Sequence, residues 1–240
     1  MNWTSANANG KYVMDSINRI AAGEQGFLDQ TQFPFYMLYQ NQPVKSFPNR
    51  VGMGYLLGYP AGLEGVASLV TPYVDTNWKD PHGSDGYAYF IDQPSTLLPY
   101  TYHVNAWDIY HQVMVNSIVG TMNVLASTQK MLLNQDTLLQ DALDIVAFDH
   151  LLALSYSTDD DTRRQFDRSY NPMTISQLSA TYPNISWHTF VPEATGAAQQ
   201  VLGKLLGDPN YKYIVMEPGK LQMLNDMLGN PNCKRSLVLR

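Results

Sequence analysis

The sequence predicts a mainly α-helical fold, a multi-helix lobe with a few short strands. Apolar residues recur every three or four positions over residues 102–133 and again over residues 136–156, which is the spacing of amphipathic helices. Strand-like composition is found in short stretches, which are residues 71–78, 87–91 and 213–216. Two long helical segments beside three brief strands favour a helical lobe over a sheet-based fold.

The first 70 residues predict short elements. Residues 12–20 fit a short amphipathic helix, and the prolines in residues 23–48 leave room for a short helix or strand between turns. Residues 51–70 contain five glycines and Pro60, which we expect to prevent a long helix there. A helical period is visible only in the second half of that stretch.

Capping and turn signals divide the second half of the chain. The run Asp159-Asp160-Asp161 is expected to lie in solvent and to begin a helix, because acidic side chains complement the positive end of a helix dipole. Thr174 and Gln177 have the spacing of a capping box, which predicts a helix that runs through Thr181. Two further helices are predicted, over residues 194–206 and 219–228.

Composition excludes several classes of partner. The chain has 240 residues, of which 45% are hydrophobic and 15% are charged, and its net charge is −6. Its basic residues form no run longer than a pair, so the sequence has no electrostatic footprint for nucleic acid. No stretch of about 18 residues is free of charged and strongly polar side chains, and the first residues lack the pattern of a signal peptide. We therefore predict neither a membrane span nor a leader in this chain.

The residue types that carry metal or nucleophilic chemistry are not arranged for it. The five histidines never stand four positions apart, and the zinc-binding pattern H-E-x-x-H is absent from the 240 residues. His103 and His111 could share a helix face, but no third ligand accompanies them. No G-x-S-x-G elbow is present. We predict no catalytic, metal-binding or cofactor-binding residue in this chain.

Two kinds of covalent modification stay open. Asn2 and Asn184 begin N-x-S/T sequons and are candidate glycosylation sites if the protein enters the secretory pathway. Cys233 is the single cysteine, which excludes a disulfide within the chain. It is either an inert thiol or the partner of a cysteine in sequence outside these 240 residues.

Three motifs in order lead to a functional prediction. Asp92-Gln93-Pro94, with Pro99 behind it, predicts a turn whose backbone the first two side chains bond, followed by an extended path toward a helix. Tyr170-Asn171-Pro172-Met173-Thr174 predicts a turn before the capped helix, and Asn184-Ile185-Ser186-Trp187 follows. The positions that define these motifs are Asp92, Gln93, Pro94, Pro99, Tyr170, Asn171, Met173, Thr174 and Trp187.

In their order and spacing these motifs resemble the amino-terminal, non-catalytic helical domain of the neprilysin family of zinc metalloendopeptidases. The resemblance is best over residues 74–215 and fainter on either side, and we assign residues 1–240 to one partial domain of this kind. It departs from the family at residues 16–18, where members have a cysteine in the early helix and this chain has none. The membrane anchor of the family is absent from this sequence as well.

The resemblance implies a role for the chain in proteolysis. Complete family members hydrolyse small peptides with a zinc ion held in a carboxy-terminal lobe that this sequence does not contain. The implied role of this chain is the wall of a cavity that admits small peptides only, inactive on its own. The implied partners are small peptides and the missing zinc lobe, and the implied location is extracellular or at the plasma membrane.

One alternative stays open from the sequence. A chain without the zinc motif could instead be a catalytically inactive remnant of such a peptidase that binds peptides or a protein partner. The apolar-rich stretch at residues 236–240 ends without a stop signal, so we expect the polypeptide to continue. Downstream coding sequence with H-E-x-x-H would favour the enzyme over the remnant.

Overall fold

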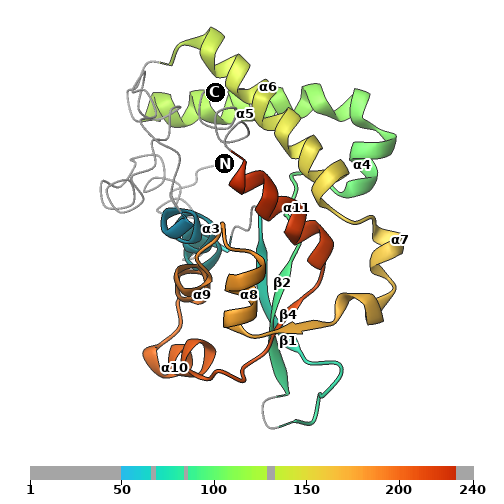
Figure 1. Cartoon of the computed structure of the whole chain (residues 1–240). Coiled ribbons are helices and arrows are strands. Elements are labelled where there is room, and N and C mark those ends of the chain that lie inside the picture. The colour runs from blue at the N-terminus through green and yellow to red at the C-terminus, as the bar shows by residue number, and fades with distance from the viewer. Residues whose placement is uncertain (1–49, 66–68, 84–85, 129–132, 231–240) are drawn as a thin grey trace, which may run out of the picture.

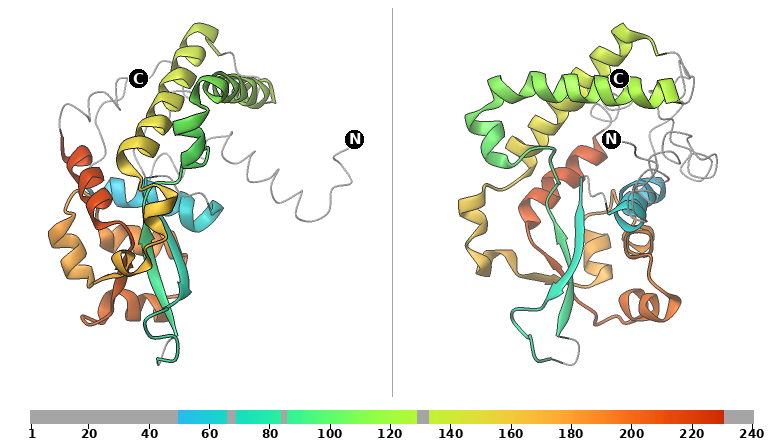
Figure 2. Two further views of the ribbon diagram at one scale, coloured as in Figure 1. Left: turned by 90° about the vertical axis from the view of Figure 1, so that its right-hand side faces the viewer. Right: turned by 180° about the vertical axis from the view of Figure 1, so that it is seen from behind.

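The computed structural model describes residues 50–65, 69–83, 86–128 and 133–230. The helix predicted at residues 12–20 and the segment 23–48 lie outside these ranges. Helices surround a small sheet, and two long helices form an arm at one end of the molecule while the first β-hairpin points toward the other end (Figures 1 and 2). The prediction of a mainly helical lobe with a small sheet is confirmed.

The sheet in the described part of the chain has four strands in the order β1-β2-β4-β3. β1 pairs antiparallel with β2, β2 runs parallel to β4, and β3 pairs antiparallel with β4. Their bounds are β1 Thr71–Thr76, β2 Tyr87–Asp92, β3 Asn171–Met173 and β4 Tyr213–Val215. The predicted strands at 71–78, 87–91 and 213–216 are confirmed.

β3 was not predicted as a strand, because the proline in it indicated a turn. β3 lies at the edge of the sheet, where Pro172 faces no further strand and its missing N–H leaves no ladder bond unmade. The turn expected over residues 170–174 is therefore a short edge strand, and this is a correction to the sequence analysis.

Alternate residues of the two central strands enter two different apolar layers. On one face Tyr89, Ile91 and Tyr213 pack in the main core beneath the helices. On the other face Phe90 is fully buried and stacks between Tyr73 and Trp78, with ring centroids 5.1 Å apart in both pairs. The helices that contribute to the main core are α3 Arg50–Glu64, α8 Ile175–Thr181, α9 Trp187–Thr195, α10 Gln199–Gly207 and α11 Pro218–Gly229.

The arm contains the two long helical segments that periodicity predicted. α5 and α6 pack through a separate small core of Met114, Val115, Ala142 and Val146. Where one helix over residues 102–133 was predicted, the chain breaks at Ala106, which has a φ of −141°. The elements of the arm are α4 Tyr100–Asn105, α5 Trp107–Thr128, α6 Gln135–Leu151 and the π-helix η2 Leu152–Tyr156.

α3 contradicts the expectation that glycines prevent a long helix before residue 63. Gly54, Gly58 and Gly62 recur every four residues and face α9. A Cβ atom at each of them would meet a backbone oxygen of residues 186–193 at 2.6 Å or less. Glycine is needed here because the two helix backbones are in contact, so close packing offsets the weak helix propensity.

The helix predicted over residues 194–206 is also wrong in its bounds. α9 occupies Trp187–Thr195, a stretch that contains Pro192, and ends at Gly196 in the left-handed conformation with a φ of 54°. α10 begins three residues later at Gln199. Glycine at this position terminates one helix where the apolar period alone suggested continuity.

The capping box at the start of α8 supplies a test of local stability. Thr174 accepts from the amide of Gln177, and the Gln177 side chain accepts from the amide of Thr174, which confirms the predicted box. Thr174→Ala should lower the free energy of unfolding by about 1 kcal/mol, because an amide at the helix start loses its acceptor. Thr174→Ser keeps the hydroxyl and should remain close to wild type in chemical denaturation. Equal losses for both would contradict the role of the cap.

Candidate functional site

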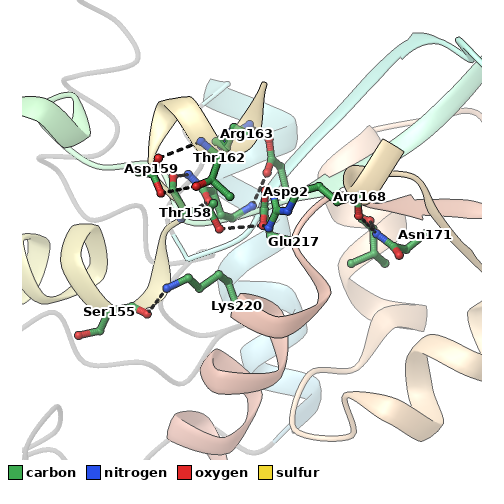
Figure 3. A network of polar contacts seen from close by, with 12 residues as sticks. Asp92, Ser155, Thr158, Asp159, Thr162, Arg163, Arg168, Asn171, Glu217 and Lys220 are labelled. Carbon is green, nitrogen blue, oxygen red and sulfur yellow. Dashed lines mark hydrogen bonds and ion pairs between the residues drawn. The ribbon is translucent and has the colours of Figure 1, made fainter. Parts of the chain in front are cut away.

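Two carboxylates are buried where the sheet meets the base of the arm. Asp92 ends β2 and is 8% exposed, and Glu217 precedes α11 and is 3% exposed. Their partners Thr158, Arg163 and Arg168 come from the segment that follows η2. We call these five residues the buried junction (Figure 3).

Arg168 binds the Glu217 carboxylate through its two terminal guanidinium nitrogens. Arg168 Nη1 donates to Oε1 at 2.8 Å and Nη2 donates to Oε2 at 2.6 Å, while the Thr158 hydroxyl donates to Oε2 at 2.7 Å. The bidentate bond to Glu217 raises the pKa of Arg168 above the already high value of an ordinary arginine. The short 3₁₀-helix η3 Phe166–Ser169 carries the arginine to this position.

Asp92 is held by a second arginine. Arg163 Nη2 donates to Asp92 Oδ2 at 2.6 Å, and the Gln93 amide donates to Oδ1 at 2.8 Å. Burial nevertheless raises the pKa of Asp92, because loss of water outweighs the opposing effects of Arg163 and of the Gln93 amide. Arg163 therefore gives the ionised Asp92 carboxylate a partner at neutral pH. The ionised form is still less favourable here than it would be in water.

The helix that carries Arg163 begins as the sequence predicts. Asp159 caps α7 Asp160–Arg163 by accepting from the Thr162 amide, so the acidic run does start a helix. The solvent exposure expected of this stretch does not extend to Arg163, whose side chain is only 30% exposed and reaches Asp92.

Gln93 ties the end of β2 to the end of the arm. Its Oε1 accepts from the Thr158 amide at 2.7 Å and its Nε2 donates to the Thr158 carbonyl at 3.4 Å. The sequence predicts bonds from this side chain to backbone within the local turn. The structure instead gives them to a residue 65 positions away. Pro94 follows in a buried position and Pro99 precedes α4.

The second motif lies beside the junction. Asn171 Nδ2 donates to the carbonyls of Arg168 at 2.8 Å and of Val215 at 3.0 Å, and the Tyr170 hydroxyl donates to Asn77 Oδ1 at 2.9 Å. Figure 3 shows Asn171 next to Arg168. The motif therefore fixes the backbone on both sides of the Arg168–Glu217 pair.

The remaining motif positions lie away from the junction. Met173 packs against the main core, Thr174 caps α8, and Trp187 is fully buried with its Nε1 donating to the Tyr182 carbonyl at 3.0 Å. Asn184 Nδ2, the atom that would carry a glycan, donates to the Asn225 carbonyl at 2.8 Å. Asn2 and Cys233 lie outside the described residues.

Four members of the junction were not predicted as site residues from the sequence, namely Thr158, Arg163, Arg168 and Glu217. One signal for Glu217 was present, because it is the single acid in the otherwise apolar stretch from β4 into α11 and stands directly before a proline. The arginines carry no local signal, since an arginine near Asp159 or Asp167 looks like a surface residue.

The residues described here do not fit a zinc site. No group of three His, Cys, Asp or Glu side chains able to hold a metal ion occurs in the described ranges. His103 contacts His150 of α6 instead of His111. In the same ranges, no helix combines the length and the apolar character needed to cross a membrane. The junction neutralises each buried carboxylate with an arginine, so its chemistry is that of a rigid anchor.

Comparison with known proteins places the chain in a family. The sequence model of Peptidase family M13, for its amino-terminal part, matches residues 1–238. No curated protein matches the chain.

Solved structures show the same fold. The zinc metalloprotease Zmp1 of Mycobacterium tuberculosis in its open state is 19% identical in sequence to this chain and superposes on it with a TM-score of 0.58. The match covers 99% of this chain and 35% of the Zmp1 chain. Zmp1 in complex with an inhibitor is 18% identical with a TM-score of 0.61, and the match covers 92% of this chain and 30% of the Zmp1 chain. The galactose containing glycoprotein complex of Haemonchus is 13% identical with a TM-score of 0.50, at 98% and 41% coverage.

The chain thus spans about a third of the Zmp1 chains that share its fold. A family match over nearly the whole sequence and a shared fold agree with the motifs at Asp92, Tyr170 and Trp187. This chain belongs to peptidase family M13, the neprilysin family, as an amino-terminal domain.

Proposed function

We propose that this chain is the non-catalytic helical lobe of an M13 zinc metalloendopeptidase, and that it forms the cavity wall that limits substrates to small peptides. The observation that carries the proposal is the match of the family's amino-terminal model to residues 1–238 of a sequence without H-E-x-x-H. Zinc in this family activates water for peptide hydrolysis. In our proposal the residues that hold the zinc belong to a different part of the enzyme.

The arm has the properties that a wall requires. The buried junction links the end of the arm to the start of α11 through Thr158 and Glu217, and Gln93 links the end of β2 to the same Thr158. Lys220 adds a bond from α11 to the Ser155 carbonyl of η2 at 2.8 Å. Ion pairs and backbone bonds at one place hold the arm at a fixed angle, which supports a size limit set by geometry.

The solvent side of α5 supports contact with another part of the enzyme or with substrate. The face of α5 toward α6 is apolar, yet Ile109, Val113 and Val124 on the opposite side are 69%, 59% and 65% exposed. In its 22 residues α5 has one charged side chain, Asp108. The same side also carries the exposed polar residues Gln112 and Asn116, so it offers apolar contacts and uncharged hydrogen-bonding groups together. We propose that this second side faces the zinc-bearing lobe or the enclosed peptide.

The remaining parts of the proposal rest on the family. We propose one domain over residues 1–240 and an extracellular or plasma-membrane location for the complete enzyme. In that location Asn2 and Asn184 would meet the glycosylation machinery. At Asn184 a glycan would compete with the bond from Nδ2 to Asn225, so occupancy should be lower there than at a sequon in an open loop.

The test compares the isolated chain with the complete polypeptide. The isolated chain should not cleave peptides, whereas the complete polypeptide should show chelator-sensitive cleavage whose kcat/KM falls steeply from short peptides to unfolded proteins. The matched control replaces the glutamate of the downstream H-E-x-x-H by glutamine. Chelator-sensitive cleavage by the isolated chain would refute the division of labour, and kcat/KM independent of substrate length would refute the wall.

The inactive remnant remains the second candidate because the exposed apolar side of α5 would serve binding equally well. Calorimetric titration of the isolated chain with short apolar peptides separates the two roles. Tight binding together with a stop codon after Arg240 would favour the remnant over the lobe of an enzyme.

A further inference from the structure

Two histidines meet at the corner where α4 docks on α6. His103 of α4 is 2% exposed, and its Nδ1 lies 3.3 Å from Nδ1 of His150 on α6. His103 Nε2 lies 3.1 Å from the Leu98 carbonyl. Trp107 of α5 stacks on the His150 ring with centroids 3.8 Å apart. One corner thus brings together three helices and the segment that leads to them.

The hydrogen-bond partners fix the tautomers. A carbonyl only accepts, so His103 Nε2 carries a proton and, in the neutral ring, Nδ1 is the acceptor. His150 Nδ1 must then donate to His103 Nδ1. A first extra proton leaves this bond intact, because it can enter at the far nitrogen of His150. A second extra proton puts N–H donors on both facing nitrogens and two positive charges 3.3 Å apart.

Asp149 explains why one charge is tolerated. Its Oδ1 accepts from the Leu97 amide at 2.9 Å, while Oδ2 lies 3.5 Å from His103 Nε2 and has no hydrogen-bond partner within the described residues. The Asp149 side chain is 9% exposed. Beyond Trp107, His111 of α5 bonds the Trp107 carbonyl, and η2 contributes no acid or base that titrates near neutral pH. One carboxylate therefore faces two imidazoles.

We propose that His103 and His150 form an acid-sensitive latch between α4 and α6, which stays closed while the pair holds at most one extra proton and opens with the second. The bond from His103 to His150 and the bond from the Leu97 amide to Asp149 tie the segment from Pro94 to Asn105 to α6, so opening loosens this segment from α6. The Leu98 carbonyl contact lies within the segment and is retained. The small core of Met114 and Val146 keeps α5 on α6. The latch therefore controls the base of the arm and leaves its length intact.

The direction of the pH effect follows from the two groups that shift. Burial, with the neighbouring His103, lowers the pKa of His150, so its contribution to stability is present above its usual value of 6.5 and is lost as the pH falls below it. Burial raises the pKa of Asp149, which acts in the opposite sense and favours the closed state as Asp149 takes up a proton at lower pH. Because the proton on His150 is tolerated and is itself taken up only below 6.5, the latch should loosen at a lower pH, where the pair accepts its second extra proton.

Hydrogen exchange on the whole chain tests the latch. Protection factors for the amides of residues 94–105, corrected for intrinsic rates, should fall at least about tenfold between about pH 7.5 and about pH 5. Protection of β2 and β4 should stay constant. Unchanged protection at residues 94–105 would overturn the proposal.

Matched variants assign the effect to the pair. His150→Gln cannot charge, and its amide can still donate to His103 Nδ1, so protection should no longer respond to acid. His188→Gln, at an exposed site on α9, should respond like wild type. If His150→Gln folds poorly, a titration of the histidine ring resonances in wild type decides. Loss of protection at residues 94–105 should begin only after the His150 ring has taken up its proton, and a loss that precedes that step would overturn the latch.

Discussion

Replacing Arg168 by alanine should lower the free energy of unfolding by about 3 kcal/mol. Glu217 would keep the Thr158 hydroxyl and lose its counter-charge while its side chain remains 3% exposed. A broken buried ion pair typically costs about 3–5 kcal/mol, and we expect the low end because water reaches the Arg168 side chain, which is 34% exposed. Urea unfolding followed by far-ultraviolet circular dichroism measures the change.

Two variants make this result specific. Arg164→Ala removes a neighbouring arginine whose pair with Asp161 is largely exposed on both sides, so stability should stay at the wild-type value within error. Combining Arg168→Leu with Glu217→Gln removes both charges and should recover much of the loss. An Arg168→Ala protein as stable as Arg164→Ala would mean that Glu217 is not buried with Arg168.

Alanine at Gly58 should destabilise the chain by about 2–3 kcal/mol, although alanine is the better helix former. A Cβ atom there would lie 2.6 Å from the Phe190 carbonyl oxygen and 2.9 Å from Glu193 Cβ. These atoms belong to the backbone and the first side-chain carbon of α9, so they can move only if α3 and α9 separate. The same denaturation measurement detects the loss.

Gly120 is the matched control on another helix. A Cβ atom added there meets nothing within 4 Å, and the residue is exposed on α5. Gly120→Ala should therefore stabilise the protein by up to about 1 kcal/mol, through helix propensity alone. Opposite signs for the two substitutions identify the α3–α9 contact as the cause. Stabilisation by both would contradict the packing of α3 on α9.

The sequence predicts elements whose signal is local. Residues 102–133 and 136–156 carry a helical period, and Thr174 with Gln177 carries a capping box, so helices were found in these places. α3 was missed because glycine is favoured at positions 54, 58 and 62 only by the short distance to α9. No local sequence pattern contains that distance.

The buried junction shows the same division. Asp92 and Gln93 were singled out because an acid and an amide before Pro94 predict backbone bonds. Their partners could not be named, because Thr158 lies 65 positions and Arg163 lies 71 positions from them along the chain. An ion pair at such a separation depends on the way the whole fold brings β2 and α7 together.

The parallel pairing of β2 with β4 has a consequence for how this topology can change. Tyr89 stands opposite Tyr213, so a closed loop of roughly 120 residues that includes the entire arm lies between neighbouring strands. The entropy of closing such a loop grows only with the logarithm of its length, and doubling it costs about 0.6 kcal/mol. Insertions or deletions between β2 and β4 therefore change the stability little, whereas pairing of the two strands, which closes the long loop, is a slow step of folding. The length of the arm can therefore change while the strands that close the loop stay the same.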